Sequence, residues 1–318
     1  MRAIVIEKFG DPGVLEMREV ERPKPGPGEL LVWVIAASVN PVDAKIRATG
    51  SWAKRALPTV LGSDASGVVE ELGPGAKGFE VGDEVYFAAE LTGDVHGTYA
   101  EYTTVPAAIV ARKPRKLTHL DAAAVPLAGG TAWEAVVRRL RLQVGQTILI
   151  HGGAGGVGSF AVQIAAACGA KVIATASAGN LETLRDLGAH VAVDYHKEDP
   201  TEVALRETGG VGVDAVLDLV GGDLTPKSCP AVRPFGRMAF ILGPKGDLSE
   251  AYRRNLELHG VRLMREGRRL EELSAAIDIG KLRPLVEEVM PLDRVADAHR
   301  RLDSGHGRGK IVLEVAAR

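Results

Sequence analysis

The chain has 318 residues, which is enough for about two domains, and its 46% hydrophobic and 25% charged residues are typical of an ordinary globular protein. A formal net charge of −2 offers no basic surface for nucleic acid or anionic lipid, so we expect small-molecule partners. No apolar run reaches the roughly 18 residues of a membrane span. The N-terminal MRAIVIEKFG is typical of a strand and not of a targeting segment, so we expect a cytoplasmic protein. Two cysteines, Cys168 and Cys229, exclude a disulfide framework and a four-cysteine zinc lobe.

The first 120 residues show short β-rich runs separated by glycine and proline turns. The runs are RAIVIE, ELLVWVIAASV, SGVVEEL, DEVYFAAE and YTTVPAAIV, and the turns include PGPGE, GPGAKG and VGDEV. This pattern predicts a compact, barrel-like β domain. The last strand candidate, Gly309–Val315, follows an amphipathic helix at Leu292–Leu302, and we expect it to return to this domain. The predicted β-rich domain therefore comprises residues 1–120 and 285–318.

A helical stretch at Leu120–Arg139 leads into a segment where strands and helices alternate. The predicted strands are TILIHG, KVIATAS, HVAVDY, DAVLDLV, GRMAFILG and GVRLMR, and the predicted helices lie near Val157–Cys168, Asn180–Leu187, Pro200–Glu207 and Asp223–Val232. Alternation of this kind predicts a mostly parallel sheet with helices on both faces. We therefore expect an α/β fold in which residues 121–284 form a doubly wound Rossmann domain.

The turn after TILIHG has the glycine spacing of a dinucleotide site. Gly153, Gly155 and Gly158 satisfy G-x-G-x-x-G between a strand and a helix, which is the context that the mechanism requires. The first glycine permits a tight turn, the second lets the backbone approach a pyrophosphate, and the third lets helix and strand pack closely. The helix N-terminus adds partial positive charge for the phosphates.

The end of the second strand of this domain favours NADPH over NADH. NAD sites place Asp or Glu there to bind the ribose 2′-hydroxyl, whereas this chain has Ser177, with Asn180 shortly after it. No carboxylate repels a 2′-phosphate, and hydroxyl and amide groups can donate to it. Alternatively, Ser177 and Asn180 cap the next helix, and both roles can coexist. A cation must come from elsewhere, for example from Arg185.

Several motifs together carry a resemblance to a known family. They are GPGELLVWVIAASVNPVDAKIR, LGSDASGVVEELGPGAKGFEVGDEVY, GTYAEYTTVP, PLAGGTAWEAV, HGGAGGVG, LRDLGAHVAVDY, VDAVLDLVGG and LDSGHGRGKIVLEV. Over nearly its whole length the chain resembles the medium-chain dehydrogenase/reductase superfamily, in the zinc-free quinone oxidoreductase (zeta-crystallin-like) branch. The resemblance implies a GroES-like β domain, a Rossmann domain and a C-terminal return to the first domain.

The zinc alcohol dehydrogenases of that superfamily hold catalytic zinc through Cys, His and Cys. The matching places here are Asn40, Ser63 and Leu127, which cannot replace thiolate and imidazole ligands, so we expect no metal. Without this Lewis acid, simple alcohol oxidation is disfavoured. The resemblance instead implies hydride transfer from NADPH to a quinone or to the C=C bond of an α,β-unsaturated carbonyl.

The resemblance also implies the catalytic residues. Asn40, in NPVD, matches a polar position beside the nicotinamide whose amide donates to the substrate oxygen, or else it is a turn residue before Pro41. Lys45 stabilises a developing enolate or is a solvated charge. Thr131 matches a threonine near the nicotinamide, or it is a helix N-cap. No acid or base is dedicated to proton transfer, so we expect water or a substrate-side group to supply the proton.

The remaining cofactor contacts come from the glycine turn and the strand ends. We expect Gly155, Gly156 and Val157 at the pyrophosphate, and Ser177 and Tyr195 at the 2′-phosphate region. The carboxyl ends of two further strands add Val220, Gly221, Leu242 and Gly243.

Alternative functions remain open at this point. A 2-enoyl thioester reductase is one, and a non-enzymatic NADPH-binding protein, such as a sensor or a crystallin-like protein, is another. Relatives often dimerise through the edge strands of their Rossmann sheets, and the apolar run GVRLMR is consistent with a homodimer.

Overall fold

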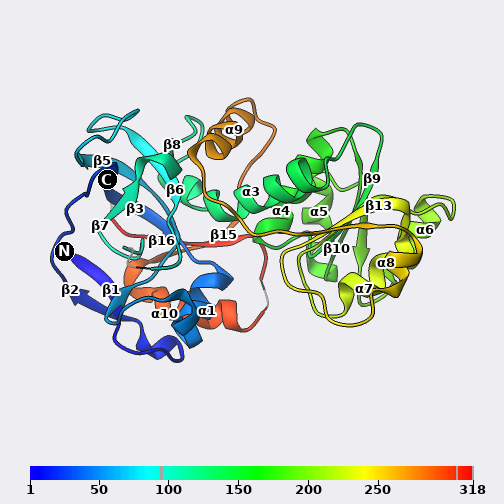
Figure 1. Cartoon of the computed structure of the whole chain (residues 1–318), viewed down its shortest axis with the longest axis horizontal. Coiled ribbons are helices and arrows are strands. Elements are labelled where there is room, and N and C mark those ends of the chain that lie inside the picture. Colours follow the sequence, from blue (N-terminus) through cyan, green and yellow to red (C-terminus); the bar gives the residue numbers. More distant parts are fainter. Residues whose placement is uncertain (94–95, 306, 317–318) are drawn as a thin grey trace. The chain divides into compact units, whose positions relative to one another are not determined.

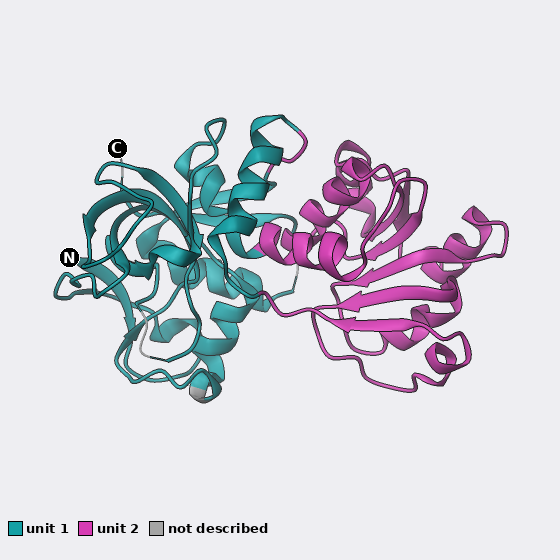
Figure 2. Ribbon diagram, turned by 45° about the horizontal axis from the view of Figure 1, so that its top comes forward, with its two compact units in different colours: residues 1–127, 264–280, 284–318 teal, residues 128–263, 281–283 magenta. Residues whose placement is uncertain are grey.

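The computed structural model describes residues 1–93, 96–305 and 307–316 and divides the chain into two compact units (Figure 2). Unit 1 comprises Met1–Leu127, Met264–Gly280 and Pro284–Arg318, and unit 2 comprises Ala128–Leu263 and Lys281–Arg283. Compared with the expected ranges, the first segment of unit 1 runs on to Leu127, and unit 1 also includes Met264–Gly280.

Unit 1 is built on two β-sheets (Figure 1). The larger has the strand order β15-β16-β3-β5-β6-β8 with β7 paired to β3, and the smaller has the order β2-β1-β4. The strands are β1 Arg2–Ile6, β2 Glu16–Glu19, β3 Glu29–Ser38, β4 Thr59–Val60, β5 Asp64–Leu72, β6 Glu84–Ala88, β7 Tyr102–Pro106, β8 Val110–Arg112, β15 Val286–Pro291 and β16 Lys310–Glu314. Strand β16 pairs antiparallel with β3, so the end of the chain completes the sheet that its beginning forms.

Helices α1 (Pro41–Thr49) and α10 (Val295–Asp303) contact one another beside these sheets. The core that they share with the strands is apolar, with fully buried Ile46, Leu30 and Phe87 among its members. The other helices with residues in unit 1 are α2 His119–Ala123, α3 Pro126–Trp133 and α9 Gly267–Asp278.

Unit 2 is a six-stranded, fully parallel sheet with the order β11-β10-β9-β12-β13-β14. Numbered along this unit the order is 3-2-1-4-5-6, the doubly wound arrangement of dinucleotide-binding domains, so the predicted α/β fold is confirmed. The strands are β9 Thr147–His151, β10 Lys171–Ala176, β11 Val191–Asp194, β12 Val213–Asp218, β13 Val232–Phe240 and β14 Glu257–Gly260. The helices are α4 Gly156–Ala167, α5 Leu181–Asp186, α6 Pro200–Glu207, α7 Leu224–Ser228 and α8 Ser249–Arg253.

Two element predictions were wrong in detail. The last strand of the sheet is β14, not GVRLMR, because residues 261–266 carry the chain from unit 2 into unit 1 and form no strand. The stretch Leu120–Arg139 is not one helix: α2 ends before Pro126, which starts α3, and Glu134–Arg139 continues as a π-helix. Proline lacks an N–H group and is tolerated at a helix start, so Pro126 divides the stretch.

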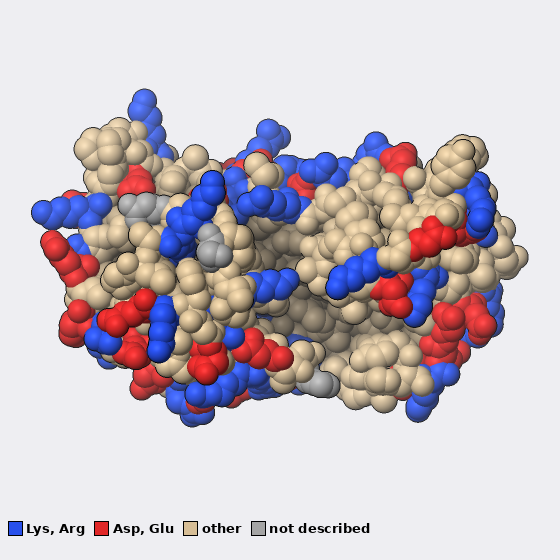
Figure 3. Space-filling view, turned by 60° about the horizontal axis from the view of Figure 1, so that its bottom comes forward, with Lys and Arg blue, Asp and Glu red and all other residues tan. Residues whose placement is uncertain are grey.

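The surface has mixed charge. Acidic and basic side chains are interspersed on the face shown in Figure 3, in keeping with the net charge of −2. No helix within the described residues is long and apolar enough to cross a membrane.

Candidate functional site

The glycine turn of unit 2 joins β9 to α4. Gly152 has a φ of 72°, which is in the left-handed region that favours glycine. The tight turn predicted at Gly153 is therefore made at Gly152. A Cβ atom on Gly158 would lie 2.1 Å from the Gly152 carbonyl oxygen. Only glycine permits this approach, so Gly158 has the packing function that its place in the motif predicts.

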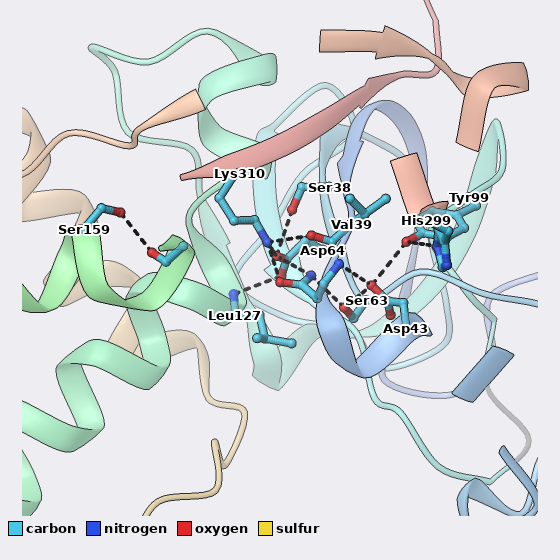
Figure 4. Close-up of polar contacts among 12 residues, drawn as sticks. Ser38, Val39, Asp43, Ser63, Asp64, Tyr99, Leu127, Ser159, His299 and Lys310 are labelled. Atoms are coloured by element: carbon cyan, nitrogen blue, oxygen red, sulfur yellow. Dashed lines mark hydrogen bonds and ion pairs between the residues drawn. The ribbon is translucent and has the colours of Figure 1, made fainter. Parts of the chain in front are cut away.

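Helix α4 begins at Gly156, with Gly155 as an extended N-cap whose Cβ position has no contact closer than 3.4 Å. Gly156 and Val157 form the first turn, and the first N–H groups of a helix have no partner within it. The Ser159 hydroxyl donates back to the Gly156 carbonyl at 3.0 Å (Figure 4). A twelve-residue helix that starts at an open glycine turn fits a pyrophosphate in charge and in space.

The ends of β10 and β11 lie side by side because Ala176 pairs with Asp194 in parallel register. The next residues are Ser177 on one strand and Tyr195 on the other. Ser177 and Asn180 stand at N-cap positions, but neither side chain makes a capping hydrogen bond. Instead, the Asn180 amide donates to the Ser177 hydroxyl at 3.3 Å. The capping alternative therefore receives no support from the side-chain contacts.

The cations near these strand ends differ from the expectation. Arg185 donates to Glu182 at 3.0 Å on the exposed face of α5, so it is already paired. The Tyr195 ring, which is 51% exposed, lies against the ring of His196 with 4.3 Å between centroids. His196 directly follows Tyr195 and is exposed, and sequence reasoning missed it.

The loops after β12 and β13 also approach one another. A Cβ atom on Gly221 would lie 2.7 Å from the Leu242 Cβ, so the segments Val220–Gly221 and Leu242–Gly243 are neighbours. Asp218, fully buried at the end of β12, accepts hydrogen bonds from the N–H groups of Val220 and Gly221, both at 2.9 Å. This carboxylate, absent from our predictions, fixes the loop.

Unit 1 holds a buried polar cluster around the N-terminus of α1 (Figure 4). Asn40 is the N-cap of this helix, and its backbone N–H donates to Asp43 Oδ2 at 2.9 Å in a capping box. The Asn40 side-chain amide donates to Ser63 Oγ and to Asp64 Oδ2, each at 3.0 Å. Its oxygen accepts a hydrogen bond from the Lys310 ammonium. Asn40 thus connects three separate segments of unit 1.

Asp64 and Lys310 form a buried ion pair within this cluster, with 3.4 Å between Nζ and Oδ2. The Asp64 carboxylate also accepts hydrogen bonds from the Ser38 hydroxyl at 3.0 Å and the Leu127 N–H at 2.9 Å. Lys310 donates to the Val39 carbonyl as well. Burial lowers the pKa of Lys310, whereas the charges of Asp64 and Asp43 act in the opposite direction.

Asp43 accepts three hydrogen bonds at Oδ2, from the Asn40 backbone, from Ser63 Oγ at 3.2 Å and from Tyr99 Oη at 3.2 Å. Burial, followed by the negative charge of Asp64, raises the pKa of Asp43 to about 6. The Lys310 charge and the hydrogen bonds from Ser63 and the Asn40 backbone act against this rise. Asp43 is thus a carboxyl group that exchanges its proton much closer to neutrality than an exposed one does.

A chain of contacts continues from Asp43 to the surface. Tyr99 Oη lies 3.2 Å from His299 Nε2, and His299 Nδ1 lies 3.2 Å from Arg47 Nη1. Arg47 Nη2 then donates to Asp303 at 2.7 Å. Burial, with the charge of Arg47 next, lowers the pKa of His299 to about 4, so this imidazole is neutral.

The residues at the two ends of the cluster fix the direction of its hydrogen bonds. Arg47 has donors only, so His299 accepts at Nδ1, carries its hydrogen on Nε2 and donates to Tyr99, which donates to Asp43. Lys310 also has donors only, so the Asn40 oxygen faces it and both amide hydrogens go to Ser63 and Asp64. In this arrangement neither hydrogen of the Asn40 amide is left for a substrate oxygen.

The other two predicted catalytic residues, Lys45 and Thr131, differ in exposure. Lys45 is exposed on α1, whereas Asp43 on the same helix is buried. Thr131 is 7% exposed and lies well inside α3, which begins at Pro126. The N-cap alternative for Thr131 is therefore wrong.

The three places that match zinc ligands carry no metal-binding side chains. Asn40 and Ser63 hydrogen bond to each other, and Leu127 contributes its backbone N–H to Asp64. Among the residues that the structure describes, no three His, Cys, Asp or Glu side chains gather in a way that would hold a metal ion. The residues at these places instead form a hydrogen-bonded cluster that contains the ammonium group of Lys310.

Sequence reasoning missed most of this cluster. Lys310 stands in GKIVLEV, where it reads as a polar residue at a strand start, and Asp64 stands in LGSDASG, where it reads as a turn residue. The available signal was that each of these charged residues stands in a strongly apolar stretch. Charged residues are almost never fully buried unless paired, so a charge in such a stretch indicates a buried partner. Tyr99 and His299 carry no comparable local signal.

Two family models match the chain: the alcohol dehydrogenase GroES-like domain over residues 26–115 and the zinc-binding dehydrogenase domain over residues 187–313. The chain is 34% identical to a 2-methylene-furan-3-one reductase of Solanum lycopersicum, over 98% of this chain and 79% of the relative. It is 30% identical to a human quinone oxidoreductase, over 98% of this chain and 97% of the relative. A mycobacterial protein solved in complex with NADPH superposes with a TM-score of 0.89 at 33% identity, covering 99% of this chain and all of that one.

These matches agree with the architecture and span both units. The chain belongs to the medium-chain dehydrogenase/reductase family of oxidoreductases, in the branch that includes quinone oxidoreductases and enone reductases.

Proposed function

We propose that the protein is an NADPH-dependent reductase that transfers hydride, without zinc, to a quinone or to the C=C bond of an α,β-unsaturated carbonyl. The observation that carries this proposal is the buried cluster at Asn40, Ser63 and Leu127. In place of thiolate and imidazole ligands it has an amide, a hydroxyl and a backbone N–H that satisfy one another and Asp64. Without a metal ion to polarise an alcohol or ketone, the acceptor must itself be electron-poor.

Quinones and enones meet this requirement because the arriving charge spreads onto a carbonyl oxygen. Oriented hydrogen-bond donors then suffice to stabilise it. The names of the two relatives, a quinone oxidoreductase and a furanone reductase, support the same acceptor classes. When bound, NADPH supplies the hydride, and the protein holds and orients the reactants.

NADPH is the cofactor that the ends of β10 and β11 support best. Ser177 and Asn180 provide uncharged donors at the place of the usual carboxylate, and their side chains are not used as helix caps. Tyr195 and the adjacent His196 form an exposed ring pair next to them. We assign contact with the 2′-phosphate to His196 as well, since an imidazole N–H can donate a hydrogen bond to a phosphate oxygen. The mycobacterial relative was solved with NADPH.

The remaining assignments follow the same proposal. Gly153, Gly155, Gly156, Val157 and Gly158 cradle the pyrophosphate. The loops of Val220, Gly221, Leu242 and Gly243 line the rest of the cofactor. Asn40 and Thr131 lie at the nicotinamide, and Lys45 is a candidate for enolate stabilisation. Because the Asn40 amide hydrogens are occupied, Asn40 acts here by holding Ser63 in place.

The test is the oxidation of NADPH, with NADH in parallel, in the presence of 1,4-benzoquinone, 9,10-phenanthrenequinone or a short 2-alkenal. We expect preference for NADPH and turnover of at least one acceptor class. Reduction of the alkenal establishes an enone reductase, whereas turnover of quinones alone establishes a quinone reductase. No oxidation with any of the three, at a protein concentration where NADPH binding is saturated, contradicts the proposal.

Two alternatives are decided by related assays. Faster reduction of a 2-enoyl thioester than of any free enone would favour an enoyl thioester reductase. Tight NADPH binding without oxidation by any acceptor would favour a binding protein.

We further propose a homodimer in the cytoplasm. Strand β14 is one of the two edges of the parallel sheet, and edge strands offer unpaired backbone groups for a second copy. Cys168 and Cys229 are both free thiols, as in a reducing compartment. Light scattering after size exclusion would show twice the chain mass, and a monomer at micromolar concentration contradicts the dimer.

A further inference from the structure

The hydrogen bonds at Asp43 Oδ2 differ in their freedom to change direction. The Asn40 donor is a backbone N–H and is fixed by the start of α1. The Tyr99 hydroxyl contacts both His299 and Asp43, and the rest of the Tyr99 side chain packs in the apolar core of unit 1. The Ser63 hydroxyl rotates about its Cβ–Oγ bond, so Ser63 is the partner best able to turn its hydrogen elsewhere.

The protonation state of Asp43 decides where that hydrogen points. As a carboxylate, Asp43 accepts the Ser63 hydrogen at 3.2 Å. When Oδ2 carries a proton it donates to Ser63 Oγ instead, and the Ser63 O–H is released for another acceptor. Burial and the charge of Asp64 raise the pKa of Asp43 to about 6, so both states are populated near that pH.

We propose that Ser63 donates the proton that the acceptor takes up on reduction. Asp43 is the positioning residue: it orients the Ser63 hydroxyl and then returns a proton to it. The inference rests on the proposed function, because only a hydride acceptor needs this proton. Hydride brings two electrons and one hydrogen to the acceptor, whose oxygen becomes an oxyanion. The Ser63 O–H bond breaks and its proton binds this oxygen, the Asp43 proton moves to Ser63 Oγ, and the Asp43 carboxylate recovers a proton from water between turnovers.

The surroundings of Ser63 support this assignment. Ser63 lies 3.0 Å from the Asn40 amide, and both stand where zinc relatives hold the metal that stabilises an oxyanion. A hydroxyl at that place supplies hydrogen-bond stabilisation and a proton together. Ser63 and Asp43 are at most 1% exposed, so the hydrogen bond between them is largely shielded from bulk water.

Other charged groups around Asp43 also affect its pKa or lie close to it. Lys310 on β16 and Asp64 on β5 affect its pKa with opposite sign. Arg47 on α1 faces it through the neutral His299 of α10 and Tyr99. The field of Asp43 also reaches Arg55, whose guanidinium donates to backbone carbonyls. A pH effect assigned to Asp43 must therefore disappear in Asp43→Asn, which keeps the shape of the side chain.

The first experiment uses the protein without cofactor. Infrared difference spectra recorded between pH 4 and 8 should show a protonated carboxyl band that titrates near pH 6 in the wild type and is missing in Asp43→Asn. Tyr99→Phe removes one hydrogen bond to the carboxylate, so the same band should titrate at higher pH. Ser66→Ala is the matched control: it removes a buried hydroxyl from β5, three residues after Ser63, where it contacts Val85 and His119 and not Asp43. A spectrum of Asp43→Asn identical to that of the wild type overturns the proposal.

The second experiment follows kcat against pH at saturating NADPH and acceptor. We expect kcat of the wild type to fall above about pH 6, and this fall to move to higher pH in Tyr99→Phe and to vanish in Asp43→Asn. Ser63→Ala should lower kcat by about a hundredfold, a usual size for general acid catalysis. The KM for NADPH should change little, Ser63→Thr should restore activity because it keeps a hydroxyl, and Ser66→Ala should behave as the wild type.

The outcomes separate this proposal from the proposed function. A wild type that reduces quinones or alkenals, with Ser63→Ala folded and equally active, refutes the proton assignment and leaves the reductase standing. A wild type that reduces no acceptor refutes both. If Ser63→Ala does not fold, the shift of the pH profile in Tyr99→Phe decides, and an unshifted profile overturns the proposal.

Discussion

At the scale of single residues, the glycines of the turn differ in why glycine is needed: one is needed for packing and another for space beside a ligand. Gly158 is required by packing, because a Cβ atom there would lie 2.1 Å from the Gly152 carbonyl oxygen. Gly155 has space for a methyl group within the protein, with 3.4 Å to the nearest atom, so packing does not require glycine there, whereas the proposed pyrophosphate contact would.

This difference predicts opposite effects of two alanine substitutions. Gly158→Ala should destabilise the protein by about 1–3 kcal/mol, as overpacking does. Gly155→Ala should cost about 1 kcal/mol or less, yet weaken NADPH binding about tenfold or more, because its methyl group faces the pyrophosphate. Urea unfolding and fluorescence titration with NADPH measure the two effects. Gly179→Ala, with open space around its Cβ position, is the neutral control for stability. Equal stability of all three variants would contradict the packing argument.

Ser177 is the residue that should set cofactor preference. Ser177→Asp places a carboxylate at the end of β10, where it repels a 2′-phosphate and accepts a hydrogen bond from a ribose hydroxyl. We expect the Kd for NADPH to rise about tenfold or more and the preference to turn toward NADH. Ser177→Ala removes only the hydroxyl and should weaken NADPH binding without improving NADH binding. Calorimetric titration with NADP⁺ and NAD⁺ checks this, and an unchanged ratio of affinities in Ser177→Asp would place the 2′-phosphate elsewhere.

At the scale of elements, the buried cluster joins α1, β5 and β16. Lys310 is the first residue of β16 and contacts Asn40 at the start of α1 and Asp64 at the start of β5. The ammonium is thus an internal tie between a C-terminal strand and two N-terminal elements.

Removal of this ammonium should leave an uncompensated buried charge. Lys310→Met is expected to destabilise the protein by about 3–5 kcal/mol, as when one partner of a buried ion pair is lost. The double variant Lys310→Met, Asp64→Asn should recover part of this loss, because no carboxylate is then left unpaired. Chemical unfolding of the single and double variants measures the coupling. A double variant less stable than the single one would mean that Asp64 does not depend on Lys310.

Asp43, on α1, should make the stability of the protein depend on pH. Its folded-state pKa of about 6 lies above the ordinary aspartate pKa of 3.8, so its folded form prefers to keep the proton. The associated stability is fully present below the unfolded pKa and is lost as pH rises through about 6, a change of about 3 kcal/mol by linkage. The stability of the wild type relative to Asp43→Asn should therefore decrease between pH 4 and 7. A constant difference across this range would assign Asp43 an ordinary pKa.

The elements differ in how far the sequence predicts them. Residues 147–177 are predicted closely because the glycine spacing, the apolar strands and the alanine-rich helix α4 all indicate one arrangement. GVRLMR fails because an apolar run does not distinguish an edge strand from a segment that leaves the sheet. The cluster at Asn40 was only half visible: its NPVD motif is local, but Lys310 reaches it from 270 residues away, and only tertiary structure shows that pairing.

At the scale of the whole molecule, the chain combines a dinucleotide-binding fold with a polar cluster at the places that hold zinc in the zinc-dependent members of the family. Unit 2 contains a complete parallel sheet with a dinucleotide turn, and unit 1 contains a polar cluster in which donors and acceptors satisfy one another. The family model that covers residues 187–313 is that of a zinc-binding dehydrogenase, but the ligand chemistry of this chain differs from that description.

Activity should therefore be independent of zinc. Zinc needs thiolate, imidazole or carboxylate ligands in tetrahedral array, and the only carboxylates of the described cluster, Asp43 and Asp64, already accept several hydrogen bonds each. Overnight dialysis against EDTA or 1,10-phenanthroline should leave kcat with a quinone or an alkenal unchanged, and elemental analysis should give much less than one zinc per chain. A zinc alcohol dehydrogenase treated in the same way is the control that should lose activity. Loss of activity here, restored by stoichiometric zinc, would mean that a metal displaces Lys310 from the cluster, and the proton assignment at Ser63 would fail with it.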